Sequence, residues 1–576
     1  MNDKTDYRLE NIRKKEMTLR AVRHEILTSE SEKALNLILD ATAPVSLVQS
    51  FPDQDLYYLL HKIGGDDFVP VLSMARSDQW EYILDVEVWN NDRLDIEGMT
   101  KTFDLLFQAD PQRMLRWIIK EKPDYFEFYL SKNMDIFIRE HDDIPPEDFD
   151  DYITFDDKFY FRFPDKPKID EDEMPVPEDS APAWELIEKM LDALARMDLS
   201  VFHGLLLETI ALLGAEAEEE QFRLKNIRLA EKGFLPTHEA IGIYQPTKLS
   251  AIRKRPVILE KNIIQFDPDI PLPPQFFSQF VKGDNLLVKA LALFTPEATL
   301  TLETEMAALI NKVISADKIK LRAKEDLEKA IKKTCACLNL GLEAICETDP
   351  TPQKAKNIIN EYFLEDIFRS GSRAAIQLTA RAVNWFKTSF MNKSHLPLSF
   401  LGEHFLGTVG GLFLDRPLYF DNYASGELYR NFQSLSDIKD TSESLDQIIA
   451  LDHFLIHLAP DISSFKEGIL TYKTLILTLW AKNRLNLEPT LEPIPVKIFK
   501  DFFIALFSKT PENAPGQIQI NDLIFWASEI LKTEDTDIPE PLKIVFSNLI
   551  KALEDEYSRV NPRDIDPKFI PHFLLK

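Results

Sequence analysis

Two histidines four residues apart are the clearest candidate metal ligands in this sequence. In the segment SESLDQIIALDHFLIHLAPD, His453 and His457 would face the same side of a helix. Asp446, seven residues before His453, falls within about 40° of that side at 100° per residue. With ligands from another helix, this polar stripe could hold a metal ion. The favoured interpretation is nevertheless that the stripe is the solvent-facing edge of an otherwise apolar helix, because no HExxH pattern supports a zinc site.

A second candidate is the glycine-containing segment LGEHFLGTVGGLFLDRPLYFD at 401–421. Glycine permits close backbone approach or positive φ, but a phosphate-binding loop would also need a lysine in the GxxxxGK pattern, and none is present. A helix-packing contact or a tight turn is therefore the favoured interpretation, and residues 402–411 are predicted to interrupt the surrounding helices. If the protein is an enzyme, Glu403 and His404 are its candidate acid–base pair, and Asp415 and Arg416 are further candidates.

The third candidate is an acidic segment from Asp142 to Asp179, which holds fifteen carboxylates against four basic residues. Hard cations require several oxygen ligands converging on one point, and no EF-hand order is present. Residues 152–155 and 159–163 are β-prone and flank an Asp-Asp pair, which predicts a small β-hairpin. The favoured interpretation is a solvated linker beside this hairpin. Two alternatives stay open: weak Mg²⁺ or Ca²⁺ association, and recruitment of a partner strand at the hairpin edge.

The three cysteines indicate a reducing compartment, because an odd and sparse count does not form a disulfide framework. Cys335 falls on an apolar stripe, with Leu327, Ile331, Leu338 and Leu342 at helical spacing. Cys337 is one step off that stripe, and the CxC spacing is not that of a common structural zinc site. We therefore expect buried, unreactive thiols.

Short helices in series dominate the elements that must position these residues. Helix starts are predicted near 52, 66, 77, 110 and 123, with Ser77 and Asp110 as N-caps and prolines at first helical positions. Helices this short are unstable alone in water and must bury their apolar stripes against neighbours. The pattern predicts stacked helical hairpins, an α-solenoid of degenerate repeats.

The segment SFPDQDLYYLLHKIGGDDFVPVLSMARSDQWEYIL resembles the cytoplasmic helical superhelix of MgtE-type magnesium transporters, over roughly residues 35–138. Related short-helix folds occur in flagellar motor switch proteins. The resemblance implies a superhelical fold but not transport, because the transporter's cystathionine-synthase-type domains and membrane helices have no counterpart here. The whole chain is also similar to a bacterial family classed only as a domain of unknown function, which implies no activity.

The predicted fold class is mostly α: α-solenoid-like repeats at the N-terminus, a small β-hairpin insertion and larger helical regions toward the C-terminus. The predicted segments are a helical-repeat domain at 1–140, the acidic hairpin and linker at 141–183, a helical domain at 184–265, a long-helix domain at 266–400 and a C-terminal helical domain at 401–576.

The formal net charge of −28 disfavours nucleic-acid and anionic-lipid partners. No apolar run opens the chain, and its most apolar helices are short and charged, so we expect a cytoplasmic protein without membrane insertion. The main hypothesis is a scaffold or adaptor that contacts other proteins through basic or amphipathic segments, with no cofactor and no catalytic activity assigned. The alternatives are a divalent-cation-responsive regulator and an enzyme with a site near 402–416.

Overall fold

Helices make up most of the computed structural model, which describes residues 2–90, 92–139, 152–164, 182–245, 252–257, 259, 273–281, 283–321, 323–347, 349–465, 470–507 and 517–576. The mostly-α fold class with small β insertions is confirmed. The chain divides into two compact units, Met1–Leu338 with Ile345–Arg369, and Asn339–Ala344 with Ser370–Lys576. The first unit takes in the first three predicted segments and most of the fourth.

The first unit begins with a run of helices, most of them short. They are α1 (Asn2–Thr28), α2 (Ser31–Leu39), α3 (Pro44–Ser50), α4 (Asp53–Ile63), α5 (Gly65–Met74), α6 (Ser77–Glu87), α7 (Ile96–Ala109), α8 (Pro111–Glu121) and α9 (Pro123–Asn133), and the pair β1 (Trp89–Asn90) and β2 (Arg93–Leu94) joins α6 to α7.

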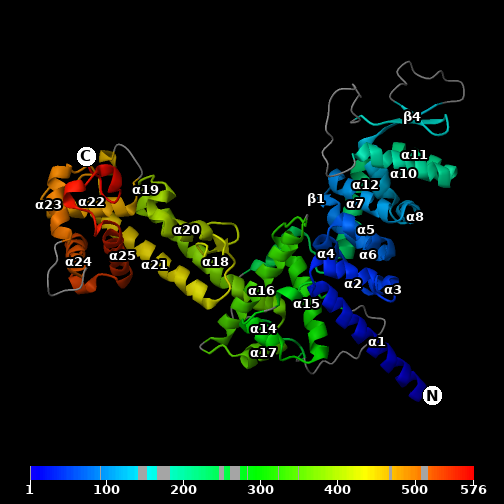
Figure 1. Cartoon of the computed structure of the whole chain (residues 1–576), viewed down its shortest axis with the longest axis horizontal. Helices are drawn as coiled ribbons and strands as arrows, with labels where there is room; N and C mark the ends of the chain where they lie inside the picture. The colour runs from blue at the N-terminus through cyan, green and yellow to red at the C-terminus, as the bar shows by residue number, and fades with distance from the viewer. Residues whose placement is uncertain are drawn as a thin grey trace. The chain divides into compact units, whose positions relative to one another are not determined.

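These short helices pack on next-but-one neighbours as well as on adjacent ones: α2 contacts α4, α3 contacts α5, α4 contacts α6 and α5 contacts α7. Figure 1 shows α2 to α8 layered in this way. Each helix thus gains from its neighbours the burial that it cannot provide alone.

Helix starts follow local sequence, with one correction. Asp110 caps α8 by accepting a hydrogen bond from the Arg113 amide at 3.0 Å, and Pro111 occupies the first helical position. The prediction that Ser77 caps α6 is wrong, because α6 begins at Ser77 itself. The residue before it, Arg76, donates its backbone N–H to the Gln79 side chain at 2.7 Å.

The predicted hairpin is present within a three-stranded antiparallel sheet of order β3-β5-β4, where β3 is Asp135–Ile138, β4 is Ile153–Thr154 and β5 is Phe159–Arg162. Asp156 forms the turn by accepting the amides of Lys158 and Phe159. Phe159 contacts Phe202 of α11 (Leu199–Ala211), so the sheet is packed on a helix. Most of the acidic segment, residues 140–151 and 165–181, lies outside the described residues.

The remaining helices of the first unit are α10 (Ala183–Met197), α12 (Gly214–Ala230), α13 (Thr237–Ala240), α14 (Leu286–Leu291), α15 (Pro296–Ala316) and α17 (Pro352–Glu361). Helices α16 (Lys324–Cys346) and α18 (Leu364–Thr388) contribute residues to both units. Cys335 and Cys346 are buried on α16 and Cys337 is partly buried, as the apolar stripe predicted. Burial raises the pKa of the Cys335 thiol to about 12.

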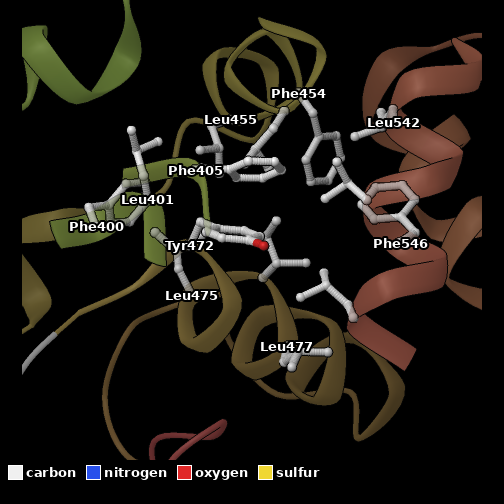
Figure 2. Close-up of a cluster of buried hydrophobic side chains, with 14 of the residues drawn as sticks. Phe400, Leu401, Phe405, Phe454, Leu455, Tyr472, Leu475, Leu477, Leu542 and Phe546 are labelled. Atoms are coloured by element: carbon white, nitrogen blue, oxygen red, sulfur yellow. The ribbon is translucent and has the colours of Figure 1, made fainter. Parts of the chain in front are cut away.

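The second unit contains α19 (Phe390–Lys393), α20 (Gly402–Leu412), α21 (Leu435–Leu458), α22 (Tyr472–Arg484), α23 (Val496–Phe507), α24 (Gln517–Leu531), α25 (Glu540–Tyr557) and the strand pair β6 (Tyr419–Phe420) and β7 (Tyr429–Arg430). Its core is aromatic and aliphatic (Figure 2): the rings of Phe405 and Tyr472 lie 5.5 Å apart, as do those of Phe454 and Phe546.

Glycines in the second unit serve helix packing. The predicted interruption at 402–411 is wrong, because α20 spans Gly402–Leu412. A Cβ at Gly407 would collide with the ring of Phe420, and one at Gly411 would lie 2.5 Å from the Leu418 carbonyl oxygen. The strand pair can therefore lie close against α20 only because these positions carry no side chain.

Candidate ligand-binding clefts

A group of ionisable residues in the first unit, some buried and some exposed, lines a cleft of about 470 Å³, here called the polar cleft. Its walls come from the end of α6, the start of α7, α12, α13 and the end of α15. The acidic residues of its lining are Asp85, Glu87, Asp92, Asp95 and Glu97. The basic and imidazole groups are Lys101, Lys225, His238, Lys318 and Lys320.

Asp85 anchors the wall between α6 and α12. Its carboxylate accepts two hydrogen bonds from Arg228, both at 2.7 Å, and its side chain is only 2% exposed. Tyr125 donates to the same carboxylate at 3.4 Å, and Trp89 donates its indole N–H to the Tyr125 hydroxyl at 3.3 Å. This network fixes the orientation of Trp89 at the cleft.

Lys225 of α12 lies beside two aromatic rings of the same cleft. Its ammonium is 4.7 Å from the ring centre of Trp89 and 5.2 Å from that of Phe222. Among the described residues it has no ion pair and no hydrogen bond. Burial lowers the pKa of Lys225 to about 8, against the opposing effect of Asp85. The cleft therefore holds a cation whose charge no neighbouring side chain balances directly.

Glu87 stands at the border between the polar cleft and a second, more apolar cavity of about 530 Å³. It accepts a hydrogen bond from Tyr57 at 2.5 Å and lies 2.8 Å from Nε2 of His61. Burial and the Glu87 charge raise the pKa of Tyr57 well above its ordinary value. Such a carboxylate can orient an imidazole, but both of its partners come from α4, which makes the group a tie between α4 and α6.

A third depression, the α12 groove, has a volume of about 710 Å³ and lies along α12 toward α13. Its apolar floor comprises Phe222, Ile227, Ala230, Leu235 and Pro236. Four glutamates and one arginine also line it: Glu216, Glu219, Glu220, Glu239 and Arg223. Phe222, Asn226, Leu235 and Pro236 line this groove and the polar cleft alike.

The candidate metal ligands of the second unit, Asp446, His453 and His457, do not converge. Asp446 forms an ion pair with Arg381 of α18. His453 and His457 are exposed, with ring centres 4.4 Å apart, and a nitrogen of His457 lies 2.9 Å from the His453 carbonyl oxygen. In the part of the chain that the structure describes, no group of three or more His, Cys, Asp or Glu side chains is arranged to hold a metal ion.

The four candidate catalytic residues are divided between the two ends of α20. Glu403 and His404 are exposed in its first turn, and His404 is 3.5 Å from the Ser444 hydroxyl. Asp415 and Arg416 follow its last turn, about 15 Å away along an 11-residue helix axis. Partial burial, together with Lys473, lowers the pKa of His404. None of the three cavities described above includes any of these four residues.

Sequence patterns did not point to the polar cleft. Asp85 and Arg228 are 143 positions apart along the chain. Lys225 stands three residues after Phe222 and three before Arg228, which is ordinary spacing on an amphipathic helix. A lysine on the aromatic side of a helix is the only local hint of the cleft, and it does not distinguish a cleft lysine from one that reaches solvent.

No individual helix among the described segments is long and apolar enough to cross a membrane. Helices α11 and α12 meet the length and composition criteria only jointly, as a pair bent by 105°.

Comparison with protein families gives one match, a family of unknown function (DUF6178), which covers residues 11–576. The chain belongs to this family. Comparisons with curated proteins and with solved structures give no match. Membership accounts for nearly the whole chain, so both compact units are part of what defines the family.

Proposed function

We propose that this protein is a helical scaffold that holds a basic, amphipathic segment of another protein in the α12 groove. The observation that carries the proposal is the combination of an apolar floor with a rim of four glutamates. An amphipathic helix lying in such a groove would place its apolar side chains on the floor and its lysines or arginines along the rim.

The floor of the groove is unusually open to solvent. Ile227 is 53% exposed at its centre, and Ala230 beside it is exposed. An apolar surface with a polar rim is typical of contact sites, because covering it removes apolar area from water. A partner side chain seated against Ile227 and Leu235 would gain this burial.

The negative charges of the rim favour a partner segment that carries positive charge. Glu220 is paired with Arg223 of the same helix at 2.7 Å. Glu216 and Glu219 have no cationic partner among the described residues, and both are exposed. Together with the net charge of −28, these free carboxylates attract cationic segments and repel anionic ones.

Binding of a short synthetic helix with leucines on one face and lysines on the other tests the proposal. The labelled peptide should bind the full chain saturably, as measured by fluorescence anisotropy, and more weakly as salt is raised to about 0.15 M and above. Ile227→Asp should weaken binding about tenfold or more, because it places a charge on the apolar floor. Ile504→Asp, at a residue of the second unit with a similar exposure of 52%, is the matched control.

A peptide of the same pattern with glutamate in place of lysine separates charge selection from non-specific adhesion. We expect it not to bind, and we expect Glu216→Gln with Glu219→Gln to reduce the salt dependence of the lysine peptide. Equal binding of both peptides, or full binding by Ile227→Asp, would show that the groove is not the docking site.

A further inference from the structure

We propose that the polar cleft binds a small organic anion with a flat aromatic body, and that Lys225 holds its carboxylate or phosphate group. This cleft adjoins the α12 groove and shares four lining residues with it, but it would serve a small molecule, not a protein segment. A volume of about 470 Å³ lies within the range of small-molecule pockets, and its walls combine aromatic rings with a few polar groups.

Most of the negative charges in the cleft are already engaged within the protein. Asp85 is held by Arg228, Glu87 by Tyr57 and His61, and Glu97 by Lys101 at 2.8 Å. Asp95 also has an interaction partner. Asp92, which is exposed, is the remaining carboxylate of the lining.

The positive charges are balanced less completely. Lys225, Lys318 and Lys320 all line the cleft, and none of their side chains forms an ion pair or hydrogen bond with any described residue; Lys318 and Lys320 are exposed, and Lys225 is half-buried. Three uncompensated lysines thus stand against one aspartate inside a chain whose overall charge is −28. A charge partly removed from water is stabilised by a counter-charge, and the half-buried ammonium of Lys225 beside Trp89 and Phe222 has none within ion-pair distance among the described residues, so a ligand could supply it.

Two rings define the shape of the ligand. Trp89 and Phe222 lie with their centres 5.5 Å apart, and the ammonium of Lys225 lies near both. An anion held by Lys225 would have its remaining atoms next to these rings. A flat apolar body therefore fits better than a fully hydrated ion such as free phosphate.

The titration of Lys225 supplies a distinctive signature. Burial lowers its pKa to about 8, and a bound anion would raise that pKa again. Binding at pH 8 should therefore take up a fraction of a proton, about one half at most. The other charged or titratable groups that line this cleft come from the helices around it. They are Asp85 and Glu87 of α6, Asp92 and Asp95 between α6 and α7, Glu97 and Lys101 of α7, His238 of α13, and Lys318 and Lys320 after α15. Arg228 of α12 contacts the cleft lining through its hydrogen bonds to Asp85.

Calorimetric titration of the full chain tests the site with three probes: 1-naphthoate, 1-naphthyl phosphate and the uncharged 1-naphthol. We expect both anions to bind and the naphthol to bind at least tenfold more weakly. The stronger of the two anions then identifies a carboxylate or a phosphate ligand. Repeating the naphthoate titration in buffers of different ionisation enthalpy at pH 8 measures the proton uptake.

Three variants separate the role of Lys225 from general charge. Lys225→Met should weaken naphthoate binding about tenfold or more, whereas Lys551→Met, at an exposed lysine of the second unit, should leave it unchanged. Lys225→Arg should keep binding but abolish the proton uptake, because arginine does not titrate near pH 8.

Equal affinity for naphthol and naphthoate, or unchanged naphthoate binding by Lys225→Met, would overturn the proposal. These outcomes are independent of the peptide experiment, since Ile227 lines only the α12 groove and Lys225 only the polar cleft.

Discussion

The polar cleft of the first unit and the α20–α21 region of the second unit both gather ionisable residues, but only in the first are two of the candidate site residues, Asp85 and Lys225, partly or wholly removed from solvent. In the cleft, Asp85 is 2% exposed and Lys225 lies beside two aromatic rings. In the second unit, His453, His457 and His404 face solvent. The difference shows that chemistry-bearing residue types become a site when separate elements remove them from water, because desolvation is what strengthens their interactions.

The same contrast appears in two carboxylate–arginine pairs. Asp85 and Arg228 join α6 to α12 with side-chain exposures of 2% and 26%, whereas Asp446 and Arg381 join α21 to α18 at 43% and 38%. Solvent screens the second pair, and the entropy lost in ordering its two side chains offsets most of their attraction. Two pairs of the same residue types therefore differ in how much they stabilise the fold, because they differ in burial.

The largest expected effect comes from the buried carboxylate of Asp55 on α4. It accepts the amides of Gln275 and Phe276, both at 2.7 Å, yet burial raises its pKa to about 7. Because the folded pKa lies above the ordinary value of 3.8, the folded state binds this proton more tightly than the unfolded state does. This tighter proton binding adds to the free energy of unfolding, and the added stability is fully present below about pH 4. It is lost as the pH rises to about 7, which lowers the free energy of unfolding by on the order of 4 kcal/mol.

Asp55→Asn should remove that loss, since an amide oxygen can still accept both hydrogen bonds but carries no charge. Denaturant unfolding of the wild-type and variant chains between pH 4 and 8 measures the difference.

Asp452 of the second unit is the comparison: it accepts the Phe390 amide at 2.9 Å, and burial also raises its pKa, with Lys393 opposing. Asp452→Asn should change the pH dependence in the same direction but less. Parallel pH profiles for wild type and Asp55→Asn would contradict the expected burial effect.

The paired carboxylates come next in size. Asp85→Ala leaves the Arg228 guanidinium without its bidentate partner, although Glu81 remains 3.1 Å away. We expect it to lower the free energy of unfolding of the first unit by about 2–4 kcal/mol. Asp446→Ala should lower that of the second unit by no more than about 1 kcal/mol.

Denaturation followed by tryptophan fluorescence measures both variants in the full chain. Similar losses for Asp85→Ala and Asp446→Ala would break the comparison, because burial would then not distinguish the two pairs. Asp85→Asn, which keeps the shape of the side chain, separates loss of charge from loss of packing.

Among the main substitutions, the smallest expected effect is that at a glycine, Gly407. Gly407→Ala forces the Phe420 ring to move and should destabilise the second unit by about 1–3 kcal/mol. Gly204→Ala, in the interior of α11 where a Cβ meets nothing within 4 Å, should instead stabilise the first unit by about 0.5–1 kcal/mol. Thermal unfolding of the two variants checks the opposite signs. An unchanged unfolding temperature for Gly407→Ala would show that close packing against Phe420 does not require glycine at this position.

Much of the fold could be predicted because its determinants are local. Asp110 and Pro111 specify the start of α8 through one hydrogen bond and one ring, and the β-prone residues around Asp156 specify a hairpin. Strand β3 was missed, since the four residues Asp135–Ile138 have no alternation of their own and pair with β5 more than 20 positions away. The wrong prediction that residues 402–411 interrupt the helices has a similar origin. The glycines of α20 are explained by the close approach of Phe420 and the Leu418 carbonyl, not by a low tendency to form a helix.

The candidate site was beyond sequence reasoning for the same reason. Asp446, His453 and His457 share a helix face as predicted by their spacing, but a shared face is not an enclosed one. The polar cleft draws on residues from Asp85 to Lys320, and no spacing rule connects them.

By itself, the sequence determined the helical class of this protein, where many helices begin, its acidic character and the core position of Cys335. These follow from hydrogen bonds and apolar periodicities that span a few residues. Only the tertiary structure decided which charged side chains lose water and which find partners. It also shows that the Lys225 side chain has no ion pair or hydrogen bond within the described part of the chain. Desolvation depends on the packing of elements far apart in the chain, and that packing has no counterpart in local spacing.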